Sequence, residues 1–92
     1  MIGYAECECF IFDAHSLKEK RAVLQRVLTR LKQKYNVSVS EVDYQDMWQR
    51  TKIAIVTVSS SKEASERELE RALKFMDSFP EWERGQTTFE WL

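Results

Sequence analysis

Half of the chain's fourteen basic residues lie between Leu17 and Tyr35, where they could bind an anion. This segment holds seven basic residues and one acidic residue, hence a net charge of +6, whereas the whole chain carries −1. Clustered positive charge attracts polyanions, and the phosphate backbone of RNA is one such partner. The segment is therefore the first candidate for a binding site.

Three of these cations, Lys18, Lys20 and Arg21, crowd the predicted start of a helix. The helix dipole is already positive there, so each cation costs about 0.3 to 1 kcal/mol unless an anion compensates. A docked RNA phosphate would supply that compensation, because free N–H groups, dipole and side chains would all attract it. Asp13 and Glu19 could instead neutralise the cations from within the chain.

Four further cations and one aromatic residue extend this prediction. An indole can stack on a base while neighbouring cations hold phosphates. Each feature also has a purely structural explanation. The tryptophan could cover the sheet edge, and the helix cations could stay solvated or pair with Glu66, Glu68 and Glu70. The predicted RNA or anion site comprises Lys18, Lys20, Arg21, Arg26, Arg30, Arg50, Lys52 and Trp48.

No arrangement of residues matches a catalytic, cofactor or metal signature. Asp13, His15 and Ser16 are close in sequence, but a triad needs groups that converge from separate segments. Cys7 and Cys9 are the only cysteines, and with a single histidine they form too poor a ligand set for a metal. We expect reduced thiols in the core, no cofactor and no enzyme activity.

Two helices are predicted from caps and apolar periodicity. The first begins at Leu17 behind a capping box of Ser16 and Glu19, with Asn36 as a left-handed stop. The second follows a box of Ser60 and Glu63 and ends before Pro80. Alternation or β-branched runs predict four strands, over residues 2–12, 37–44, 51–59 and 87–91.

This order of strand, helix, strand, strand, helix, strand predicts one α+β domain over residues 1–92. The economical arrangement is the ferredoxin-like βαββαβ fold, a four-stranded antiparallel sheet with both helices on one face. Right-handed crossovers place strands one and three at the centre. The other sheet face is expected to stay open.

The open face could serve as an interface through Tyr4 and Phe10. Glu6 and Glu8 lie between these two rings and would repel RNA, so we expect a protein surface there, including a second copy of the chain. Ile2 shares that face, and we expect Trp91 or Phe89 there as well. Dimerisation is favoured if Ile53 and Ile55 also lie on it.

Three segments together resemble the YlxP-like family of small bacterial proteins: Ser16 to Arg21, Asp46 to Arg50, and the strand that follows. The resemblance extends over essentially the whole chain. It implies a ferredoxin-like fold and a bacterial cytoplasmic protein, with genes often near those for translation initiation and ribosome maturation. It implies no established activity, ligand or catalytic residue.

Our leading hypothesis is a non-enzymatic accessory protein that binds structured RNA or a ribosomal particle through the basic first helix. The alternative is a protein interaction module, a homodimer through the open face whose basic helix engages an acidic protein. We expect a cytoplasmic location, since the N-terminus lacks a basic secretory signal and no apolar run could span a bilayer. Neither a membrane nor DNA is an expected partner. The sequence pI of about 5.8 is low for an RNA-binding domain, so the hypothesis depends on local charge.

Overall fold

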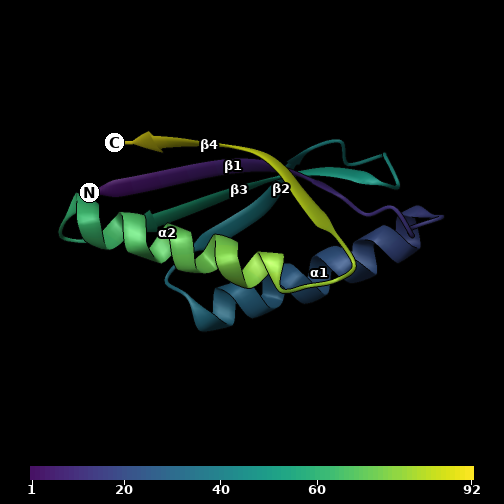
Figure 1. The fold of residues 1–92 in the computed structure, drawn as a ribbon, viewed down its shortest axis with the longest axis horizontal. Coiled ribbons are helices and arrows are strands. Elements are labelled where there is room, and N and C mark those ends of the chain that lie inside the picture. Colours follow the sequence, from purple (N-terminus) through teal and green to yellow (C-terminus); the bar gives the residue numbers. More distant parts are fainter.

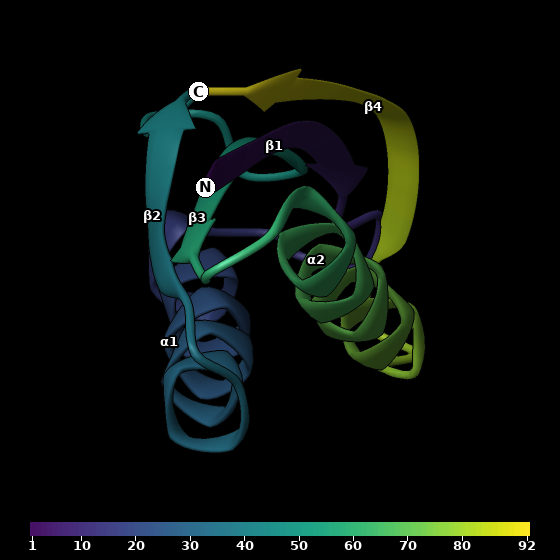
Figure 2. The ribbon, with the colours of Figure 1, turned by 90° about the vertical axis from the view of Figure 1, so that its left-hand side faces the viewer.

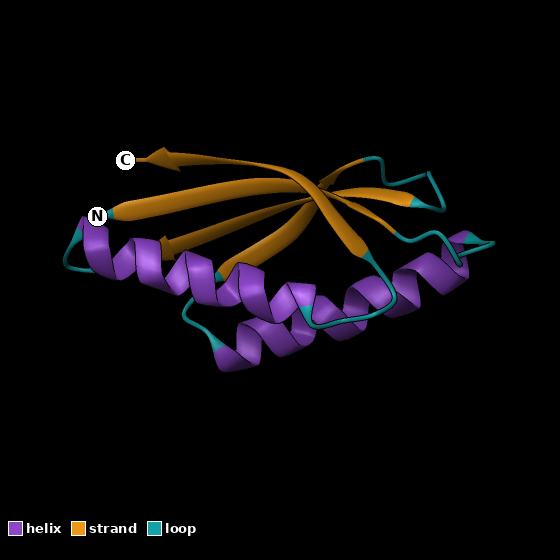
Figure 3. Cartoon of the chain, viewed as in Figure 1, coloured by secondary structure: helices purple, strands orange, loops and turns teal.

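The computed structural model describes all 92 residues as one elongated α+β unit in which two helices lie along one face of a sheet (Figures 1 and 3). Both chain ends lie at one end of the molecule, where Ile2 and Leu92 exchange backbone hydrogen bonds of 3.1 and 2.8 Å. The elements are β1 (Ile2–Phe10), α1 (Leu17–Lys34), β2 (Ser38–Asp43), β3 (Arg50–Val58), α2 (Lys62–Asp77) and β4 (Glu83–Trp91).

The four strands form one antiparallel sheet in the order β2-β3-β1-β4. Viewed from the end, both helices pack on the same side of it (Figure 2). The predicted ferredoxin-like fold is confirmed, and β1 and β3 are central as expected. Central position suits β1, whose small inner side chains allow α2 to pack closely.

The core fills the space between the sheet and the helices. Cys7 and Cys9 of β1 are buried beside Ile53 and Ile55 of β3, and the two thiols are free. The expected burial of both cysteines is confirmed. Ile53 and Ile55 do not contribute to the open face, because alternation along β3 places both side chains on the helix side.

Phe89 and Trp91 are also absent from the open face, contrary to one of our expectations. They pair in register with Ala5 and Gly3, whose side of β1 faces the helices. A Cβ at Gly3 would lie 2.7 Å from the Trp91 ring and 3.0 Å from Leu69 of α2. The glycine therefore makes room for the indole on the helix side of the sheet.

The first helix begins as predicted and ends differently. Ser16 Oγ accepts a hydrogen bond from the Glu19 amide at 3.1 Å, and the Glu19 carboxylate accepts from the His15 amide at 2.5 Å. Asn36 was wrongly predicted as a left-handed stop, because the chain leaves α1 through extended backbone at Tyr35, with φ of −126°. The Asn36 side chain instead donates to the carbonyl of Val58 at 3.2 Å.

The second helix is capped one residue later than predicted. Ser61, rather than Ser60, accepts from the Ala64 amide, at 3.1 Å. Ser59, Ser60 and Ser61 offer the same chemistry in sequence, so periodicity alone leaves the capping residue open by one position.

The last strand begins at Glu83, four residues before the predicted start. Glu83 to Gln86 has weak strand propensity, and its ladder with β1 is irregular between Cys7 and Cys9. Gly85 lies against Phe10, since a Cβ there would be 3.0 Å from that ring. Tertiary pairing therefore extends a strand that local sequence does not favour.

Candidate nucleic-acid interface

Lys20, predicted as a phosphate anchor, is fully buried. Its ammonium group lies 2.9 Å from a Glu41 carboxylate oxygen and donates to the carbonyls of Tyr44 at 2.6 Å and Gln45 at 3.4 Å. A lysine has three donors, so the chain itself occupies them all. This is a correction: Lys20 leaves the set of residues that could bind an outside anion.

The sequence carried a signal for this burial that our prediction missed. At about 100° per residue, Lys20 lies in the middle of the stripe formed by Leu24, Val27 and Leu31. Its partner Glu41 lies two residues after buried Val39, so both side chains are on the inner side of β2. A cation and an anion that interrupt two facing apolar surfaces predict a buried pair.

The loop between β2 and β3 is fixed by this lysine and by Gln49. The Gln49 side-chain amide donates to the backbone carbonyls of Phe12 and Ala14, both at 3.0 Å. The backbone carbonyl of Gln49 accepts a hydrogen bond from the Ile11 amide. Tyr44 has a φ of 61°, the only positive φ in the chain. The loop thus contains a residue in the left-handed backbone conformation, and the buried Lys20 ammonium donates a hydrogen bond to its carbonyl.

Other cations of α1 remain exposed. Lys18 and Arg21 form no ion pair within 4.0 Å, so neither Asp13 nor Glu19 neutralises them. Arg26 pairs with Glu81, which lies beyond α2, rather than with the acids of that helix. Arg30 lies 5.7 Å from the Phe79 ring centroid and keeps its charge on the surface. Two more exposed cations without an ion pair, Lys32 and Lys34, follow along the helix.

Arg50 and Lys52 lie on the open sheet face, away from α1, and carboxylates occupy both. The Arg50 guanidinium donates to both Glu8 oxygens, at 3.0 and 3.1 Å, and stacks over Tyr44 at 4.0 Å. Lys52 lies 3.3 Å from Glu6. These two residues were predicted as supporting cations, but the structure pairs both with carboxylates of β1.

The open face has a polar centre. The Tyr4 hydroxyl donates to Glu6 at 2.6 Å, and this bond, with burial, raises the pKa of Tyr4 to about 12. The same bond and Lys52 lower the pKa of Glu6. Tyr4 and Phe10, predicted as interface residues, are both only partly exposed. Apolar exposure on this face gathers at the end that holds the chain termini; it comprises Ile2, Val56 and Val58.

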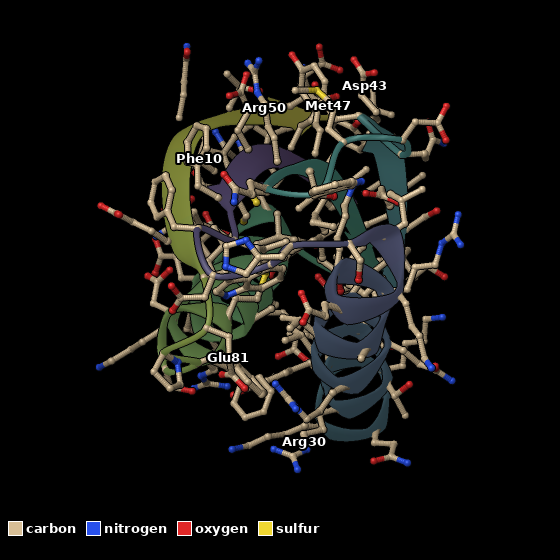
Figure 4. All side chains as sticks on the ribbon, turned by 90° about the vertical axis from the view of Figure 1, so that its right-hand side faces the viewer. Phe10, Arg30, Asp43, Met47, Arg50 and Glu81 are labelled. Atoms are coloured by element: carbon tan, nitrogen blue, oxygen red, sulfur yellow. The ribbon has the colours of Figure 1, made fainter.

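Trp48 is half exposed, with 51% of its surface open to solvent. It lines a hollow of about 600 Å³ at the end of the molecule opposite the termini. Figure 4 looks onto this end and shows Phe10, Met47 and Arg50 on the sheet side of the molecule, with the helices on the other side. The predicted RNA site included Trp48 and Arg50, and Phe10 was predicted as an interface residue. The other lining residues, Phe12, Asp46, Met47 and Gln49, were not predicted as site residues.

No group of three or more His, Cys, Asp or Glu side chains is placed to hold a metal ion. Neither helix is both long and apolar enough to cross a membrane. Hydrogen bonding with Cys7 and burial raise the pKa of the Cys9 thiol, so it stays protonated in the core.

Comparison with known proteins places the chain in a family. A family model described as "Protein of unknown function (DUF503)" matches residues 2–89. "Uncharacterized protein YlxP" of Bacillus subtilis (strain 168) is 64% identical over 91 residues, which is 99% of each chain. A solved structure, "De novo designed protein Foldit4", covers 100% of this chain and 99% of its own with a TM-score of 0.61; at 17% identity it supports the fold alone. The match over nearly the whole length shows that the chain belongs to the YlxP-like DUF503 family.

Proposed function

We propose that this protein is a non-enzymatic accessory factor that binds structured RNA, or a particle rich in it, through the exposed surface of α1. The anchors are Lys18 and Arg21 at the helix start, with Arg30, Lys32 and Lys34 along the helix. Lys20, Arg50 and Lys52 are excluded because carboxylates of the chain already hold them.

One observation carries the proposal: Lys18 and Arg21 stand unpaired in the first turns of an 18-residue helix. Cations at that position oppose the dipole, and Glu19 is the only acid in the first turn. The nearby acid Glu41 pairs with buried Lys20, so it does not neutralise the two surface cations. An external polyanion turns this unfavourable local charge into binding energy.

A cytoplasmic location goes with this proposal, because two free thiols persist where the environment is reducing. A second candidate, a protein interaction module that dimerises through the open sheet face, is favoured by the exposed Ile2, Val56 and Val58. The acidic and basic groups that pair across the centre of that face weigh against it, since interface centres are usually depleted in charge.

The test is RNA binding by a variant with both free cations removed, Lys18→Gln with Arg21→Gln. With three to five phosphate contacts, log affinity of the natural chain should fall against log salt with a slope of roughly −2 to −4.5. The double variant should bind ribosomal RNA or ribosomal subunits at least tenfold more weakly, with a slope shallower by about 1.5 to 2. Cosedimentation and fluorescence anisotropy across a salt series measure both quantities.

A matched control removes two exposed cations from α2, as Arg67→Gln with Arg71→Gln. It changes the net charge by the same amount, so it should reproduce only a small, nonspecific loss. Equal losses in the two double variants, or none in either, would contradict the assignment of the site to α1.

A further inference from the structure

The hollow beside the β2–β3 loop presents flat aromatic surfaces to solvent. Phe10 and Phe12 stack with ring centroids 5.7 Å apart and planes within 6°. Phe12 is 60% exposed, so much of its aromatic surface is open to solvent. Met47 and Trp48 form further apolar parts of the same hollow, and both are about half exposed. Such a surface is costly to leave in water.

The fold holds this surface rigidly in place. The buried ammonium of Lys20 fixes the carbonyls at the start of the loop, and Gln49 ties its end to the β1–α1 connection. Tyr44 adopts a left-handed backbone within the same loop. Loops kept rigid at such cost are typical of binding sites, because a preformed site avoids the entropy of ordering.

Two polar groups at the hollow define what it could hold. Asp46 is exposed and forms no hydrogen bond or ion pair within the chain, so its carboxylate is a free acceptor. The charge of Arg50 is compensated by Glu8, whose two carboxylate oxygens accept from Nη2 at 3.1 and 3.0 Å. The free Asp46 carboxylate and the paired Arg50 guanidinium together disfavour a phosphate in the hollow. They favour a flat group that donates hydrogen bonds to the carboxylate.

We infer that the hollow binds an unpaired nucleobase of the RNA that α1 holds, with guanine preferred. The base stacks on Trp48, and its edge donates to Asp46. Guanine offers two adjacent donors on its Watson–Crick edge, N1–H and N2–H, which match the two oxygens of a carboxylate, whereas uracil offers one. This inference rests on the proposed function and adds to it the recognition of one unpaired base.

The position of the hollow supports an RNA occupant over an apolar peptide. The hollow and the start of α1 lie at the same end of the molecule (Figure 1), and the Lys20 contacts join the helix to the loop directly. The free cations Lys18 and Arg21 belong to the first turns of α1, and so they lie at the end of the molecule that also holds the hollow. A strand held by its phosphates at the helix can extend a base into the hollow, as in other sites that combine stacking and cationic contacts.

The experiment compares three RNA hairpins that differ at one position: fully paired, with one bulged guanosine, or with one bulged uridine. The natural chain should bind the guanosine hairpin about tenfold more tightly than the paired one, with uridine between them. Trp48→Ala should abolish the preference for bulged RNA while affinity for the paired hairpin stays unchanged. Asp46→Ala should abolish the preference for guanosine over uridine. Fluorescence anisotropy gives each affinity.

Phe89→Ala is the matched control, because it removes another half-exposed aromatic ring outside the hollow. It should keep both preferences. Equal affinity of the natural chain for bulged and paired hairpins overturns the inference but leaves the proposed function standing. Absence of binding to all three hairpins overturns both. Self-association that Trp48→Ala abolishes, measured by light scattering without RNA, would assign the hollow to a second copy and also overturn the inference.

Discussion

Lys20 shows how one side chain can organise a surface that it never reaches. Its ammonium group joins a carboxylate of β2 to two carbonyls of the β2–β3 loop. Glu41 is held in turn by the Thr51 hydroxyl at 2.6 Å. A buried charge is tolerated when all its donors have partners. Removing one partner leaves the remaining polar groups unpaired where water cannot easily solvate them. Lys20 is therefore a positioning residue for the loop.

Replacing this lysine should destabilise the protein strongly. We expect Lys20→Met to lower the free energy of unfolding by about 3 kcal/mol, because Glu41 and two carbonyls lose their partner. Lys18→Met, two residues away on the exposed surface, should change it by less than about 0.5 kcal/mol. Urea denaturation measures both. A small effect of Lys20→Met would show that Lys20 is not a structural pin.

The failure to predict Lys20 has a physical cause. Helical periodicity assigns a face to every residue, and Lys20 shares the face of Leu24, Val27 and Leu31. Charge alone suggests solvent, because most lysines are exposed. The conflict is resolved by Glu41, which lies 21 residues further along the chain, so the pattern of α1 has to be compared with that of β2 before the pair can be recognised. Lys18 and Arg21, which have no such partner, stayed on the surface as predicted.

At the scale of elements, long periodic segments were predictable and short polar connections were not. β1, α1 and β3 follow from alternation or apolar stripes. The end of α1 and the start of β4 depend on tertiary contacts of Asn36 and Gly85. The cap of α2 was misplaced because three consecutive serines could each accept from a first-turn amide, and Ser61 does. The hollow was missed because Phe12 and Met47 meet Trp48 only when two connections are brought together.

The cap of α2 can be tested by two neighbouring substitutions. Ser61→Ala removes the acceptor for the Ala64 amide and should lower the free energy of unfolding by about 1 kcal/mol. Ser60→Ala should have almost no effect, since Ser60 is exposed and caps nothing. Thermal or urea unfolding of the two variants distinguishes them. A larger loss for Ser60→Ala would place the helix start one residue earlier.

Across the whole molecule, the two surfaces differ in how their charges are arranged. The open sheet face pairs its cations with its own acids, Arg50 with Glu8 and Lys52 with Glu6. The exposed side of α1 keeps most of its cations free, although the chain as a whole carries −1. The net charge therefore conceals a cationic surface that ends beside an aromatic hollow. An RNA bound to this surface would leave the sheet face uncovered.

A titration of isotope-labelled protein with a structured RNA, followed by NMR amide shifts at low and high salt, tests this account most directly. We expect shifts concentrated at Lys18, Arg21 and Arg30, with further shifts at Asp46 and Trp48, all weakened as salt rises. Residues of the open face, such as Tyr4 and Val56, should not move. Shifts confined to that face, or no shifts at any salt concentration, would contradict RNA binding through α1.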